Sequence, residues 1–184
     1  MVECDICREE HSEVDLLPIE EKRKDQIKNF LKIQFDIEID DKYIEDYKQA
    51  LTHYNDQRKG GFREPERLAF LGDSYLEFIV RKHLFNHKPI FSIGEMDDLK
   101  KLLVDNEIWK NIAIEIELGD QIVTVVQGIG HTPQGFENKI EDRTILARSF
   151  EAIAGVLSYD TKGHPEEKLI ALFIKLNYLP THAD

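Results

Sequence analysis

Apolar residues recur at three- and four-residue steps along most of the chain, which is the spacing of helices that bury one face. This pattern predicts an all-α fold in which short polar or glycine-containing segments join the helices. The expected helices cover residues 19–35, 41–51, 66–80, 93–103, 106–118, 143–160 and 166–178, and the expected loops are residues 54–64, 86–91 and 120–142.

Length and composition fit one globular domain. The chain has 184 residues, of which 41% are hydrophobic, enough to form a single core. We expect residues 1–18 to form an N-terminal arm and residues 19–184 to form the domain. No apolar run approaches the roughly 18 residues of a membrane span, and the first residues lack the basic and apolar regions of a secretory signal. We therefore expect no membrane association and an intracellular, cytoplasmic location.

The N-terminal arm contains both cysteines of the chain. Cys4, Cys7 and His11 have a C-x2-C-x3-H spacing, which supplies part of a zinc site. Zinc usually takes four ligands, commonly from two such groups. The simpler interpretation is a loose arm with free thiols in a reducing compartment. A zinc site completed by a distant histidine or by a partner chain is the alternative.

The most informative stretch is the helix expected from Glu66 onward. Pro65 suits the first helical position, where a missing N–H costs nothing. Helical spacing places Glu66, Ala69 and Asp73 on one stripe, and Leu68, Leu71, Tyr75, Leu76 and Ile79 form the expected apolar face. Gly72 lies in the middle of this helix, where it costs about 1 kcal/mol relative to alanine. Its presence predicts that another backbone packs closely at this point.

The sequence of this helix, E-R-L-x-F-L-G-D-x-x-L, resembles the signature helix of the ribonuclease III family. A later segment, I-L-A-R-S-F-E-A from Ile145 with Gly155 and Asp160 following, resembles the family's second acidic motif. The resemblance covers about residues 45–178. It includes the Ala-Leu-Thr-His segment ahead of the signature helix, whose His53 is expected to be structural. It implies a ribonuclease III-like endonuclease domain that forms helical dimers.

The family pattern implies four carboxylates that hold Mg²⁺ or Mn²⁺ over the scissile phosphate. They correspond to positions 69, 73, 148 and 151, and the acid at position 66 supports them. Here Glu66, Asp73 and Glu151 are present, and Asp73 and Glu151 are the expected metal ligands. Ala69 and Arg148 replace the other two.

These replacements change the charge of the expected site. The four positions carry a net charge of −1, because Arg148 offsets one of the two carboxylates that remain. Arginine is always charged and matches carboxylates in a planar fork. We therefore expect Arg148 to pair with Glu151, with Asp73 or with both. A residual metal site, aided by Glu66 and Glu77 on nearly the same helix face, is the alternative.

The resemblance implies a protein that processes structured or double-stranded RNA, with impaired or absent cleavage because two ligands are missing. The expected partner is a second copy or another ribonuclease III-family protein. One alternative is an active magnesium-dependent endoribonuclease with a rearranged ligand set, and another is a structural subunit of an RNA–protein assembly. Only residues 179–184 follow the last expected helix, so no C-terminal RNA-binding domain is expected in this chain. With a net charge of −12, affinity for duplex RNA should be weak and dependent on salt.

Overall fold

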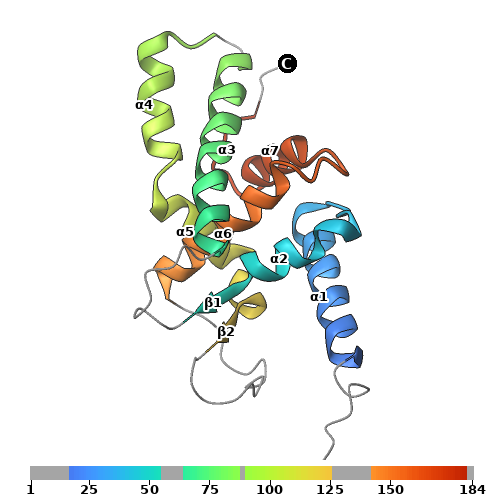
Figure 1. The fold of residues 1–184 in the computed structure, drawn as a ribbon. Coiled ribbons are helices and arrows are strands. Elements are labelled where there is room, and N and C mark those ends of the chain that lie inside the picture. The colour runs from blue at the N-terminus through green and yellow to red at the C-terminus, as the bar shows by residue number, and fades with distance from the viewer. Residues whose placement is uncertain (1–16, 55–63, 88–89, 126–141, 182–184) are drawn as a thin grey trace, which may run out of the picture.

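The structure is a computed structural model that describes residues 17–54, 64–87, 90–125 and 142–181 (Figure 1). Helices dominate these residues, so the expected all-α class is confirmed. The helices are α1 (Leu17–Phe35), α2 (Ile44–Ala50), α3 (Glu64–Asn86), α4 (Ile93–Leu103), α5 (Asn106–Glu115), α6 (Arg143–Leu157) and α7 (Pro165–Lys175), with two short 3-10 helices, η2 (Asp41–Tyr43) and η3 (Leu118–Gln121). No described helix is long and apolar enough to cross a membrane.

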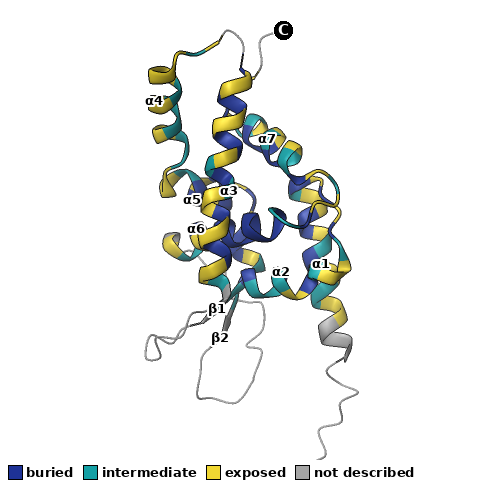
Figure 2. Ribbon diagram, turned by 45° about the horizontal axis from the view of Figure 1, so that its top comes forward, coloured by how far each residue is buried: buried dark blue, intermediate teal, exposed yellow. Residues whose placement is uncertain are grey.

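Helices α3 and α6 pack against each other more extensively than any other pair of elements. Around their contact lies a core built mainly of aliphatic side chains from α1, α2, α3, α5, α6 and α7, and Figure 2 shows the buried faces of these helices turned toward one another. A group of aromatic rings lies on the far side of α6: Phe150 stacks on Trp109 at 5.9 Å and on Phe35 at 6.4 Å, measured between ring centroids. Helix α6 is therefore buried nearly all round.

Two glycines allow α3 and α6 to approach so closely. A Cβ atom built on Gly72 of α3 would lie 1.7 Å from the backbone oxygen of Glu151 in α6. A Cβ atom on Gly155 of α6 would lie 2.1 Å from the backbone oxygen of Leu68 in α3. Since no side chain fits between these backbones, the close packing that Gly72 predicted is confirmed, and Gly155 contributes the reciprocal contact.

Residues 36–43, between α1 and α2, are fixed to the C-terminal end of α6 by a buried carboxylate. One oxygen of Asp160 accepts hydrogen bonds from the backbone N–H of Asp40 and from the hydroxyl of Tyr47, each at 3.1 Å. Burial raises the pKa of Tyr47, so its hydroxyl keeps the proton that it donates. Lys162 then donates to the backbone oxygen of Ile39 at 3.3 Å. Asp160, which closes the second acidic motif of the sequence, thus has a structural role.

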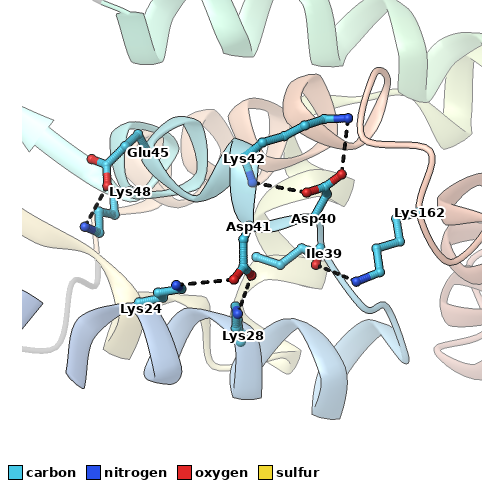
Figure 3. Close-up of polar contacts among 9 residues, drawn as sticks. All are labelled: Lys24, Lys28, Ile39, Asp40, Asp41, Lys42, Glu45, Lys48 and Lys162. Carbon is cyan, nitrogen blue, oxygen red and sulfur yellow. Dashed lines mark hydrogen bonds and ion pairs between the residues drawn. The ribbon is translucent and has the colours of Figure 1, made fainter. Parts of the chain in front are cut away.

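Figure 3 shows how the same segment is joined to α1. Asp41 forms ion pairs with Lys24, at 3.3 Å, and with Lys28, both of which belong to α1. Asp40 accepts a hydrogen bond from the backbone N–H of Lys42 and so caps η2. The exposed ion pairs add little energy individually, but together with Asp160 they set the position of α1 against the α3–α6 pair.

The structure corrects several expectations about individual elements. Thr52–Tyr54 and Val123–Val125 form a short parallel pair of strands, β1 and β2, with His53 opposite Thr124. The sequence predicted a helix end and a loop there. Leu71 of α3, which the sequence assigned to an apolar face, is exposed instead. Helix α4 has no buried residue, and a capping box between Ser92 and Glu95 begins it.

The division into an arm of residues 1–18 and a domain of residues 19–184 stays a prediction. Helix α1 begins at Leu17, close to the expected boundary. Cys4, Cys7 and His11 lie outside the described residues, so the structure does not bear on their assignment as free thiols or as zinc ligands.

We expect Gly72→Ala and Gly155→Ala each to destabilise the protein by about 3 kcal/mol or more, because the added methyl group would meet backbone that cannot move aside. The measurement is chemical denaturation followed by circular dichroism. Gly94→Ala on α4 is the matched control, since nothing lies within 4 Å of the added atom, and it should stabilise by about 0.4–1 kcal/mol. Equal effects at all three glycines would contradict the close approach of α3 and α6.

Candidate functional site

The α3–α6 crossing brings Asp73 and Glu151 together. Asp73 lies one residue after Gly72 on α3, and Glu151 is the α6 residue whose backbone meets Gly72. Their environments differ, because Asp73 is exposed whereas Glu151 is only 2% exposed. Burial raises the pKa of Glu151, the positive charge of Arg148 lowers it by a smaller amount, and the negative charge of Asp73 raises it again. Asp73 therefore lies near enough to Glu151 for its charge to act on that carboxyl group.

Arg148 pairs with the buried carboxylate. Its Nη1 atom lies 3.2 Å from Oε2 of Glu151, one turn further along α6. Pairing with Glu151 is therefore confirmed, whereas the described residues show no ion pair between Arg148 and Asp73. The arginine side chain is 63% exposed and its partner is 2% exposed. Arg148 thus neutralises Glu151 from the solvent side of the site.

A cavity of about 490 Å³ lies beside this pair, between β1, the first turns of α3 and the first turns of α6. Glu66, Ala69 and Arg148 all line it, so the structure brings together three of the positions that the sequence placed at the site. His53, expected to be structural, also lines this cavity from β1. The side chain at position 69 is the methyl group of a buried alanine, so α3 presents no carboxylate to Arg148 from this position.

A second cavity, of about 170 Å³, lies on the α5 side of Arg148. Lys110 and Glu107 of α5 line it together with Arg148 and Glu151. Lys110 forms an ion pair with Glu107 and its side chain is only 4% exposed. Sequence reasoning missed this second basic group. The available signal was a lysine flanked by the buried residues Trp109 and Ile112, three positions after a glutamate.

Glu77 does not join the site. Its carboxylate binds Lys100 of α4 at 2.5 Å and Arg81 of α3 at 2.7 Å. The hydrogen bond from Lys100, followed by that from Arg81, lowers the pKa of Glu77. One alternative drawn from the sequence had Glu77 supporting a residual metal ion, but the side chain is engaged between α3 and α4 instead.

The donor groups of this site do not suit a divalent cation. Magnesium binds oxygen ligands and is usually held by one or two carboxylates together with waters and substrate phosphates. Within the described residues, no three His, Cys, Asp or Glu side chains gather closely enough to hold a metal ion. Asp73 and Glu151 come nearest to forming a ligand pair, and Arg148 places a fixed positive charge on one of them. The residues present therefore do not match the metal site that the resemblance implied.

The family model of the ribonuclease III domain matches residues 66–162, which include most of α3 and all of α4, α5 and α6. The chain belongs to the ribonuclease III family. It is 38% identical over 113 residues to ribonuclease 3 of Legionella pneumophila (strain Philadelphia 1), a match that covers 61% of this chain and 46% of the relative. It is 34% identical over 123 residues to ribonuclease 3 of Buchnera aphidicola subsp. Acyrthosiphon pisum (strain Tuc7), covering 67% of this chain and 50% of the relative.

Solved structures of ribonuclease III nuclease domains agree with this assignment. The nuclease domain of ribonuclease III from Campylobacter jejuni, studied for structural flexibility in the region involved in its dimer formation, matches with a TM-score of 0.58 and 27% identity. That match covers 79% of this chain and 95% of the Campylobacter chain. By contrast, the chain spans about half the length of the curated ribonuclease 3 relatives.

The titration of Glu151 offers a test of the site as described. Because its pKa is raised by burial, the folded protein holds this proton more tightly than the unfolded chain does. The free energy of unfolding should therefore fall as pH rises from about 4.5, the ordinary pKa of glutamate, through the folded pKa of Glu151. Glu151→Gln should remove that part of the pH dependence and become more stable relative to wild type toward pH 7.

Arg148→Gln is the companion variant, measured by the same denaturation curves. In wild type, Arg148 opposes the effect of burial on the pKa of Glu151. Removing this cation should raise that pKa further, so the free energy of unfolding should go on falling to a higher pH. Parallel pH profiles for wild type and Glu151→Gln would show that Glu151 is not buried in the way described here.

Proposed function

We propose that this chain is a ribonuclease III-family protein that acts on structured or double-stranded RNA with impaired or absent cleavage. The observation that supports the proposal is the ion pair of Arg148 with Glu151 at the α3–α6 crossing. It lies at the positions to which the family resemblance assigns the metal ligands. Family membership supports RNA as the substrate class, and the loss of two carboxylates supports the deficit in catalysis.

Electrostatics explains why the deficit should be severe. In metal-assisted phosphodiester hydrolysis, the cation generates the attacking nucleophile and stabilises the leaving oxygen. The net charge of −1 at the four ligand positions attracts Mg²⁺ or Mn²⁺ far less than four carboxylates would. To bind a metal ion, Glu151 would also have to give up its pairing with Arg148 while it stays buried, which is costly. Cleavage by this chain should therefore be slow or undetectable.

We further propose that α3 provides the surface of a two-fold dimer, with a second copy or with another ribonuclease III-family protein. Several large apolar side chains of α3 are exposed although the chain folds into one domain: Phe70, Leu71, Phe78 and Phe85. Phe70 is the extreme case, with 78% of its area exposed. Exposed apolar surface of this extent is typical of protein interfaces, and the similar nuclease domain from Campylobacter jejuni contains a region involved in dimer formation.

The cleavage assay separates the proposal from an active enzyme with a rearranged ligand set. The double variant Ala69→Glu plus Arg148→Asp rebuilds the four-carboxylate set and should restore binding of Mn²⁺, measured by calorimetry. It should also bring EDTA-sensitive cutting of duplex RNA above the level of wild type. Each single change alone should help little, because ligand number and charge act together.

Wild-type chain is the reference in this assay, and Asp73→Asn in the double-variant background is the control, since it should abolish any restored activity. Robust EDTA-sensitive cutting by wild type that Asp73→Asn abolishes would overturn the proposal and favour the rearranged enzyme. A third outcome, no RNA interaction combined with copurification in a large RNA–protein assembly, would favour a structural subunit.

Sedimentation tests the dimer. We expect wild type to be dimeric at concentrations on the order of tens of micromolar and Phe70→Ser to shift the equilibrium toward monomer, because the variant removes a large exposed aromatic side chain. Ile33→Ser on α1 is the matched control, since Ile33 is also exposed, at 65%, but lies on a different helix. A monomeric wild type, or the same shift in both variants, would contradict an interface on α3.

A further inference from the structure

We propose that Arg148 binds a backbone phosphate of duplex RNA directly, so that an arginine takes over the contact that a metal ion would otherwise mediate. This inference rests on the proposed function, because it assumes that duplex RNA is the ligand. It goes beyond that proposal by naming the residue and the type of contact, and by making RNA binding independent of divalent cations.

The exposure of Arg148 is the first observation that supports this contact. An exposed guanidinium can contact a ligand from solvent while it stays paired with a buried carboxylate. Here the arginine side chain is 63% exposed while Glu151 is 2% exposed. Within the described residues, Arg148 donates one hydrogen bond, from Nη1 to Glu151, and its Nη2 and Nε atoms donate none. Arginine has five N–H donors in a planar fork that suits phosphate as well as carboxylate.

The cavities on both sides of Arg148 supply the space. Arg148 lines the cavity of about 490 Å³ toward β1 and also the cavity of about 170 Å³ toward α5. Its side chain therefore has open space beside it in both directions. Thr144 lines both cavities with it, and Ser149 lines the larger one. Hydroxyl groups beside a guanidinium are common additional donors to phosphate oxygens.

The charges around Arg148 have opposing effects, and their positions decide the balance. Glu66 and Asp73 are acidic and oppose an anion, but both are exposed to solvent, where salt screens them. Glu151 is buried beneath Arg148 and is already paired with it. A phosphate would meet the guanidinium directly, through charge-assisted hydrogen bonds that are about twice as strong as neutral ones. Lys110 is not a competing ligand, because it is buried and paired with Glu107.

The test is the binding of a short duplex RNA in EDTA, measured by fluorescence anisotropy over a series of salt concentrations. Wild type should bind weakly, and Arg148→Gln should bind on the order of ten-fold more weakly at low salt, the size expected for loss of a hydrogen bond to a charged group. The slope of log affinity against log salt should decrease by about 1, since one phosphate contact is lost. Arg148→Lys should retain the slope but not the full affinity, because lysine keeps the charge without the fork.

Arg81→Gln is the matched control. Arg81 is also exposed, at 57%, and is also paired with a glutamate on its own helix, Glu77, so the variant makes the same change in net charge away from the site. It should leave both affinity and slope unchanged. Thermal denaturation and sedimentation of each variant check that fold and assembly are intact.

The outcomes separate this inference from the proposed function. If wild type binds RNA and Arg148→Gln matches it in affinity and slope, the phosphate contact is wrong while the RNA-binding function stands. If wild type binds only when Mg²⁺ is added, a metal ion makes the contact and the inference is likewise overturned. If wild type binds no duplex RNA even at low salt, the proposed function itself fails.

Discussion

The close approach of α3 and α6 is the constraint on which the rest of the structure depends. Two helices whose backbones touch through Gly72 and Gly155 leave no room for side chains between them, so their relative position is fixed by hard contacts rather than by adjustable packing. Everything carried by the two helices near the crossing is positioned by the same contact. Glu151 provides the clearest example, because its own backbone oxygen meets Gly72 while its carboxylate is buried beside the crossing.

That burial determines the chemistry of the site. A glutamate placed there by the scaffold must be neutralised by a proton, by a metal ion or by a neighbouring cation, since an isolated buried charge is expensive. In this chain Arg148 is the neighbouring cation. Arg148 occurs at a position that the family resemblance assigns to a carboxylate, and it pairs with Glu151 at another such position. At position 69, a second position that the resemblance assigns to a carboxylate, Ala69 lines the cavity that Arg148 also lines.

The sequence was most predictive where local chemistry decides the structure. Pro65 near the start of α3 and the backbone contact at Gly72 each depend on a few neighbouring residues or on a single steric requirement. It was less predictive where the outcome depends on which helix packs on which face. Leu71 has the helical spacing of a core residue but is exposed, because α6 covers only one side of α3. Strands of three residues, such as β1 and β2, are too short to give a periodic signal.

At the candidate site too, the sequence predicted what depends on local spacing and missed what depends on tertiary packing. Spacing placed Glu66, Ala69 and Asp73 on one stripe. Spacing, charge and the family resemblance together predicted that Arg148 would pair with Glu151, Asp73 or both, and the ion pair with Glu151 is present. Spacing did not reveal Lys110, which lines the smaller cavity from α5, or the position of Arg148 beside two cavities. Both depend on tertiary packing. The fold itself needs none of these charges: the glycine contact, the aromatic group around Phe150 and the Asp160 hydrogen bonds are all independent of positions 69 and 148. The packing of the α3–α6 pair is therefore compatible with an alanine at position 69 and an arginine at position 148, where the family resemblance implies carboxylates.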